Sequence, residues 1–75
     1  MNLADRYDLW CDLTQEYHGR HQSLTRFAKN PSGVRKGARL RVGDHYGRRA
    51  IADVLDVLGD GTVILDVDNT TYYEV

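Results

Sequence analysis

Cationic side chains in the middle of the chain have the types and the spacing to bind phosphate groups. Arg39 and Arg41 alternate along a predicted strand, so both would project from one of its faces. Tyr46 lies in the turn that follows, where an exposed ring could stack on a base. Cations with an exposed ring suit the backbone of RNA or DNA with one stacked base. The predicted nucleic-acid-binding residues are Arg35, Lys36, Arg39, Arg41, Tyr46, Arg48 and Arg49.

The charge of the chain is divided into blocks, although its formal net charge is only −1. Residues 17–49 contain nine Lys and Arg residues against one Asp, whereas residues 50–75 contain six Asp and Glu residues and no Lys or Arg. The basic middle favours a phosphate-containing partner, and the acidic ends favour a cationic one. The alternative is that the blocks neutralise one another within the fold, because surface ion pairs are common and individually weak.

A second pattern has the residue types of an active site. The segment VILDVDNTT, residues 63–71, runs from an apolar strand into Asp66, Asp68 and Thr70. It resembles the first motif of haloacid-dehalogenase-type phosphatases, in which the first Asp is the nucleophile, the second is an acid or base, and magnesium bridges carboxylate and phosphate. Those enzymes draw a lysine and further carboxylates from a large doubly wound domain, for which 75 residues leave no room. We therefore expect no enzymatic activity, no catalytic residues and no cofactor.

Histidine and cysteine side chains offer a metal site as another alternative. His18 and His21 are three residues apart and Cys11 lies upstream, but structural zinc needs four ligands. His45 has no Ser, Thr or Cys placed beside it as a nucleophile. We expect no metal, a solvent-facing histidine pair, and a buried, inert Cys11 thiol.

Helical spacing predicts an amphipathic helix over residues 3–17. Its apolar arc is formed by Leu3, Tyr7, Trp10, Leu13 and Tyr17. Its opposite side carries an acidic stripe, which is the predicted surface for a protein partner: Asp5, Asp8, Asp12 and Glu16. Residues 20–30 are compatible with a second short helix capped by Ser23, and Asn30-Pro31-Ser32-Gly33 would end it.

From Ala38 onward the hydrophobic period changes to two, which predicts a small antiparallel sheet. Residues 38–42 and 62–67 alternate apolar and polar side chains, and residues 59–61 indicate a hairpin turn. Residues 48–58 fit either a short helix or a bent strand with a bulge. Residues 71–75 can form a last edge strand, where Tyr72 and Tyr73 could pair with a partner or a second copy.

A series of features between Lys36 and Val67 matches a known small-barrel pattern. They are the Lys36-Gly37 start, alternating Leu40 and Val42, Gly43 and Gly47 around a turn, Val54 and Val57, the Asp60-Gly61 hairpin, and Val63 and Leu65. The segment resembles the KOW-type barrel of ribosomal proteins and transcription elongation factors. It departs from that family where Ala50 and Ala52 replace an expected glycine. The resemblance covers under half of the chain and implies an SH3-like barrel that binds RNA, DNA or another protein without catalysis.

Together these patterns predict one α+β domain over residues 1–75. A helical part (1–30) and a linker (31–37) precede a β-rich part (38–75), a small antiparallel sheet or SH3-like barrel of three to five strands. We expect a non-catalytic module that binds nucleic acid through residues 35–49. The alternative is a protein–protein interaction module, such as an inhibitor or adaptor of phage or mobile-element type, that uses the acidic helix face and exposed tyrosines.

Cysteine usage and the apolar stretches set expectations about location and partners. The single cysteine excludes an internal disulfide, and no secretory signal is visible at the start. No apolar stretch approaches the length of a membrane span. We therefore expect a cytoplasmic protein with no membrane partner, and the edge strand leaves room for homo-oligomer formation.

Overall fold

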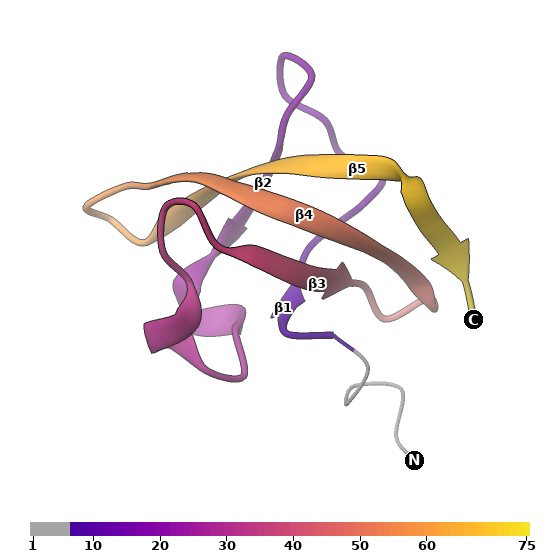
Figure 1. The fold of residues 1–75 in the computed structure, drawn as a ribbon, viewed down its shortest axis with the longest axis horizontal. Helices are drawn as coiled ribbons and strands as arrows, with labels where there is room; N and C mark the ends of the chain where they lie inside the picture. Colours follow the sequence, from indigo (N-terminus) through magenta and orange to yellow (C-terminus); the bar gives the residue numbers. More distant parts are fainter. Residues whose placement is uncertain (1–6) are drawn as a thin grey trace.

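The computed structural model describes residues 7–75, which form one five-stranded mixed sheet (Figure 1). The strands are β1 (Leu9–Trp10), β2 (His21–Leu24), β3 (Arg39–Gly43), β4 (Arg48–Val57) and β5 (Thr62–Glu74). Their spatial order is β1-β3-β4-β5-β2, with β1 parallel to β3 and all other neighbours antiparallel. Two 3-10 turns, η2 (Thr25–Phe27) and η3 (Pro31–Gly33), connect β2 to β3. None of the helical turns in this part of the chain is long and apolar enough to cross a membrane.

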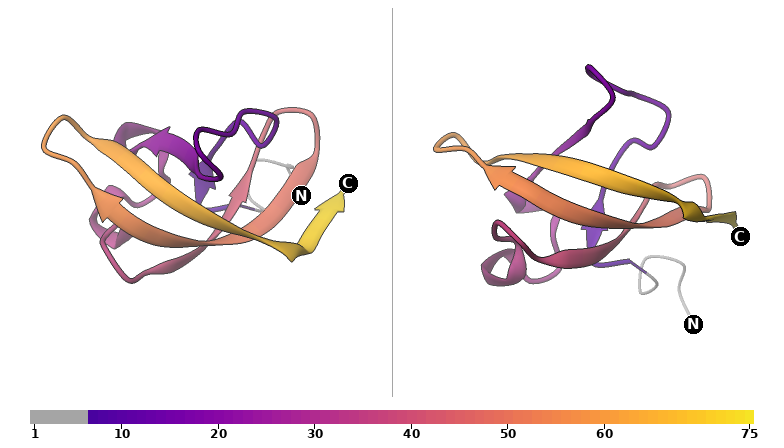
Figure 2. Two further views of the ribbon diagram at one scale, coloured as in Figure 1. Left: turned by 90° about the horizontal axis from the view of Figure 1, so that it is seen from above. Right: turned by 45° about the horizontal axis from the view of Figure 1, so that its top comes forward.

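The sheet curls into a small, nearly closed barrel because its two outer strands meet (Figure 2). The hydroxyl of Ser23 in β2 donates a hydrogen bond to the main-chain carbonyl of Trp10 in β1. Leu9 forms an isolated antiparallel bridge with Ala28, just after η2. The architecture is therefore a small barrel, one of the two forms predicted for the β-rich part, but its sheet is mixed and not antiparallel throughout. Contacts between Leu9, Trp10, Ser23 and Ala28 close it.

The core lies inside this curled sheet. Its buried apolar side chains come from every strand except β2 and from two connecting segments. They are Leu9, Cys11, Val34, Val42, Ala50, Ala52, Val54, Val63 and Leu65. The alternation predicted for β3 and for the start of β5 is confirmed, because Val42, Val63 and Leu65 are fully buried. At the end of β3 only glycine fits. A Cβ on Gly43 would lie 2.8 Å from a ring carbon of Tyr7 and 2.9 Å from the side chain of Arg49.

The two longest strands form the predicted hairpin. The Leu58 amide donates to the Thr62 carbonyl at 2.8 Å, and Gly61 at the turn has a φ of +91°, which favours glycine. Residues 48–57 are a bent strand, β4, with register shifts near residues 50 and 55, so the short helix is excluded there.

β5 continues where the sequence predicted a turn and a separate edge strand. It bends near Thr71 instead of reversing (Figure 1). The Thr71 hydroxyl donates to the Asp68 carbonyl at 2.6 Å and accepts the Ile51 amide at 2.7 Å. This side chain replaces the main-chain bonds that are lost at the bend, and the strand resumes its pairing with β4.

The expected helix over residues 3–17 is wrong. Residues 3–6 lie outside the described part of the chain, and residues 7–17 contain β1 and turns but no α-helix. Tyr7, Leu9 and Cys11 are buried at alternate positions, which is the period of a strand. The same segment has both the helical spacing of Tyr7 and Trp10 and an alternation with a period of two. The segment adopts the strand conformation because it pairs with β3.

The second helix, over residues 20–30, is also wrong. β2 occupies residues 21–24, and its inward side chains are His21 and Ser23 rather than apolar residues. The carbonyls of Leu13 and Trp10 satisfy their polar atoms. The expected solvent-facing histidine pair is therefore corrected as well, because His21 is only 5% exposed. The described residues form an all-β fold and not an α+β one.

Candidate functional site

The outer face of β3 carries a set of ion pairs, which we call the arginine face: Arg39, Arg41, Asp8, Asp53 and Asp68. Arg39 donates to both carboxylate oxygens of Asp53 at 3.1 Å and to Asp68 at 3.0 Å. Arg41 donates to the two oxygens of Asp8 at 3.0 and 3.3 Å. These hydrogen bonds from Arg41 hold the pKa of Asp8 below its usual value. The predicted shared face exists, and its guanidinium groups are engaged by the chain's own acids.

The two arginines of the next strand lie in different environments. Arg48 forms an ion pair with the buried Asp44 at 3.2 Å and lies 5.6 Å from the ring centre of Tyr46, which is 82% exposed. Arg49 is only 2% exposed, donates to two main-chain carbonyls, and lies against the ring of Tyr7. Arg49 is therefore part of the interior and cannot reach a ligand on the surface.

The remaining predicted binding residues are placed apart from these. Arg35 and Lys36 are exposed in the loop before β3. The structure thus divides the seven predicted nucleic-acid-binding residues among an exposed loop, the ion-paired arginine face, the Tyr46–Arg48 pair and the core.

The residues of the alternative, protein-binding surface do not share one face. Asp5 lies outside the described residues, and Asp8 belongs to the arginine face. Asp12 accepts hydrogen bonds from the amide and hydroxyl of Thr14 at 3.0 and 2.6 Å, whereas Glu16 is simply exposed. Without a helix, the predicted acidic stripe has no common backbone to align it.

Both tyrosines near the end of the chain are exposed on β5. Tyr72 donates to Glu74 at 2.9 Å, and Tyr73 is 52% exposed. β2 pairs with β5 only as far as Leu65, so the later residues of β5 have one edge that β2 does not cover.

The phosphatase-like carboxylates have structural partners. Asp68 accepts from the amide and hydroxyl of Thr70 at 3.1 and 2.6 Å and from Arg39 on its other oxygen. The Thr70 and Arg39 contacts lower the pKa of Asp68. Asp66 lies 3.8 Å from Arg20. Within residues 7–75, no three His, Cys, Asp or Glu side chains gather closely enough to hold a metal ion.

Cys11 is a core residue. It is fully buried, as expected, and its thiol lies 3.7 Å from the Gln22 carbonyl. Burial raises the pKa of the Cys11 thiol to about 12. The Cys11 side chain therefore packs in the core of the barrel as a small apolar group.

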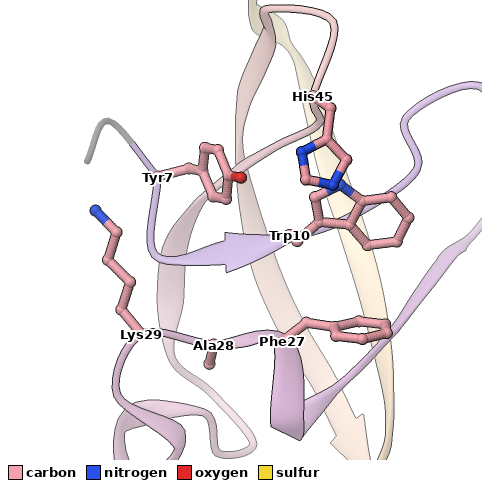
Figure 3. Close-up of a pocket in the computed structure, with 6 residues that line it drawn as sticks. All are labelled: Tyr7, Trp10, Phe27, Ala28, Lys29 and His45. Carbon is pink, nitrogen blue, oxygen red and sulfur yellow. The ribbon is translucent and has the colours of Figure 1, made fainter. Parts of the chain in front are cut away.

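One hollow of the described surface was not predicted from the sequence. We call it the aromatic pocket, and it is lined by Tyr7, Trp10, Phe27, Ala28, Lys29 and His45 (Figure 3). Its volume is about 490 Å³. It lies at the seam where the barrel closes, because the Lys29 amide donates to the Asp8 carbonyl at 3.0 Å and Leu9 bridges to Ala28. These contacts place the rings of Tyr7 and Trp10 opposite the ring of Phe27, the last residue of η2.

The rings of the aromatic pocket contact one another. Trp10 and Phe27 meet edge to face with their centres 5.3 Å apart, and His45 lies over Trp10 at 5.7 Å. The buried Asp44 accepts the amides of Tyr46 and Arg48, and this shapes the turn that aims His45 at Trp10 (Figure 3). The walls are held by the fold, while the pocket stays open.

Few polar groups line the aromatic pocket. Its lining residues include Lys29 and His45, and no carboxylate side chain lines it among the described residues. The indole Nε1 of Trp10 is buried and has no acceptor in the described part of the chain. A buried donor in this state is rare in a purely structural position.

Sequence reasoning missed this site because three distant segments build it. The helical spacing predicts Tyr7 and Trp10 on the apolar face of one helix, and Phe27 falls within the segment predicted as a second helix. His45 was considered only as a general base. The available signal was the concentration of rings in segments that are otherwise polar, but nothing in a linear pattern tells which rings meet.

The chain was compared with protein families, curated proteins and solved structures, and none matches it. The small-barrel architecture therefore rests on the strand order and the closure described above.

Proposed function

We propose that this domain is a non-catalytic binding module that captures a segment of a partner protein by taking an apolar side chain into the aromatic pocket. The observation that carries the proposal is the pocket itself, an open hollow of about 490 Å³ walled by four rings. Concave, mostly apolar hollows with few polar groups are the usual form of binding sites. Aromatic side chains also dominate the energetics of protein interfaces.

The lining favours an apolar side chain over a nucleobase. The lining residues with polar side-chain atoms are Tyr7, His45 and Lys29, together with Trp10, whose indole nitrogen is enclosed. Each polar atom of a base edge that these groups leave unpaired costs about 1–3 kcal/mol. A buried leucine or phenylalanine side chain instead gains about 1.5–3 kcal/mol by transfer from water.

The cations support the same preference. Nucleic-acid binding depends on lysines and arginines that are available to phosphates. Four of the seven predicted residues are engaged within the fold: Arg39, Arg41, Arg48 and Arg49. The resemblance of residues 36–67 to KOW-type barrels fits a binding role without catalysis, and it leaves the partner class to be tested.

Isotope-labelled protein titrated with small probes tests the proposal by NMR. The probes are the N-acetyl amides of leucine, phenylalanine and serine, and the oligonucleotides oligo-dT and oligo-U. We expect the leucine and phenylalanine amides to shift the Trp10 indole signal and the amides of Phe27, Lys29 and His45 in a saturable way. The serine amide should leave them in place.

Two alanine variants provide the matched comparison. Phe27→Ala removes a pocket wall that is 40% exposed, so the fold tolerates its loss, and it should abolish the saturable shifts. Tyr46→Ala removes an exposed ring next to His45 but outside the pocket, and it should bind like the parent. The proposal is wrong if neither apolar amide binds the pocket. Salt-sensitive oligonucleotide binding there would replace it with the nucleic-acid function.

A further inference from the structure

A second hollow adjoins the aromatic pocket and shares two of its walls. We call it the polar pocket; it measures about 260 Å³ and includes Trp10, Phe27, Asp12, Gln15 and Gln22 in its lining. Trp10 and Phe27, whose ring centres are 5.3 Å apart, belong to both hollows. The two pockets are therefore neighbours along one surface, separated by this pair of rings.

The two pockets differ in the charged side chains that line them. Lys29 lines the aromatic pocket, whereas Asp12 lines the polar pocket, and no lysine or arginine does so among the described residues. The hydrogen bonds from Thr14 hold the pKa of Asp12 below its usual value, so this carboxylate is charged at neutral pH. Gln15 and Gln22 are exposed and add amide oxygens. A guest for the polar pocket should thus carry a positive charge.

We propose that the two pockets are adjoining subsites for one extended segment of a partner protein, with an apolar side chain in the aromatic pocket and a lysine or arginine side chain in the polar pocket. This inference rests on the proposed function and names the chemistry of its partner. The faces of Trp10 and Phe27 would receive the cation's stem, and Asp12 would pair with its charged end.

The geometry of an extended chain fits this arrangement. Side chains two residues apart along a strand point to the same face and are separated by about 7 Å, enough to straddle one layer of rings. A main-chain carbonyl between them would pass over the shared wall. There it would supply the acceptor that the Trp10 Nε1 lacks, once the exposed His45 side chain moves aside.

Selection from a random dodecapeptide library displayed on phage tests the inference. The full chain is the bait, with Phe27→Ala as the counter-selection bait. We expect enriched peptides to carry a lysine or arginine two positions before or after an apolar residue. The affinity of one enriched peptide should fall by about two- to fivefold in Asp12→Asn, the scale of one exposed ion pair. It should fall by at least about tenfold in Phe27→Ala.

A charge-reversal pair separates specific recognition from general attraction. Asp12→Lys should shift the selected cation to an acid, whereas Asp56→Lys makes the same charge change on β4, outside both pockets, and should preserve the original motif. Circular dichroism establishes that both variants are folded. The two-subsite inference is overturned if the enriched peptides carry an apolar residue but no lysine or arginine, and if substitution of Asp12 does not change their affinity. That result would leave the proposed function intact. No enrichment over the Phe27→Ala bait would overturn both.

Discussion

The arginine face and the aromatic pocket are two chemically rich regions of one small barrel, and they use their groups in opposite ways. On the arginine face, Arg39 and Arg41 each meet carboxylates at about 3.0 Å, so charge is matched within the chain. In the aromatic pocket, Trp10 and Phe27 meet edge to face, His45 lies tilted over Trp10, and a hollow remains beside these rings. The charged groups of the first region are paired within the chain, whereas the rings of the second leave a hollow among the described residues.

The difference shows that a charged strand face is weak evidence for a charged partner. Ion pairs between exposed side chains contribute little to stability, and they still occupy the groups that a phosphate would need. Exposed rings around a hollow are stronger evidence for binding, because folding gains little from leaving them uncovered. The clearest tests therefore compare how the two regions respond to substitution.

The largest effect is expected where the pocket wall is packed against the core. Gly43→Ala places a Cβ 2.8 Å from the Tyr7 ring and 2.9 Å from Arg49, so backbone and ring must separate. Overpacking of this kind costs about 1–3 kcal/mol of unfolding free energy. Urea unfolding followed by the fluorescence of Trp10, the chain's one tryptophan, measures the loss. Gly59→Ala is the control, because nothing lies within 4 Å of its added Cβ. An unchanged urea midpoint for Gly43→Ala would show that Tyr7 and Arg49 move aside without a loss of stability.

An intermediate effect is expected at the seam that closes the barrel. Ser23→Ala removes the buried donor to the Trp10 carbonyl and leaves that acceptor unsatisfied. The unfolding free energy should fall by about 1–2 kcal/mol, and the NMR signals of β1 should broaden. Ser32→Ala is the matched change, since its hydroxyl bonds to Asn30 at the surface, and it should have almost no effect. Equal losses in the two variants would mean that the seam does not hold the pocket.

The smallest effect is expected on the arginine face, and it depends on pH. The folded state lowers the pKa of Asp8 through Arg41, and the pKa of Asp68 through Thr70 and Arg39. Their stabilisation is therefore present above the unfolded pKa of about 3.9 and is lost as the pH falls through the folded values.

Urea titrations between about pH 5 and pH 2 should show this decline in the parent and a shallower one in Asp68→Asn. Asp56→Asn, an exposed carboxylate at the far end of β4, serves as the reference. If the decline in Asp68→Asn were as steep as in the parent, the ion pairs of Asp68 on the arginine face would not contribute to the free energy of unfolding.

Several parts of the fold could be read from the chain because their information is local. The alternation of Leu40 and Val42 with arginines predicts β3, and the glycines around Asp60 predict the hairpin between β4 and β5. The secondary structure of the N-terminal segments was predicted wrongly because some of the side chains that they bury are polar. His21 and Ser23 face inward on β2, where carbonyls of a distant segment satisfy them. The sequence does not show which main-chain carbonyls will accept hydrogen bonds from these side chains, so it does not predict that they are buried.

The sequence by itself determined the composition of the charge blocks, the strand period after Ala38 and the turns that connect those strands, because these depend on neighbours along the chain. Tertiary structure alone decided that the arginines of β3 meet Asp8, Asp53 and Asp68, and that Trp10, Phe27 and His45 surround one hollow. The ion pairs follow from strand pairing, which sets β3 beside β4 and the segment before β1. The hollow follows from closure of the barrel, which brings the segment around β1 to the residues after β2. Both depend on contacts between residues far apart in the sequence.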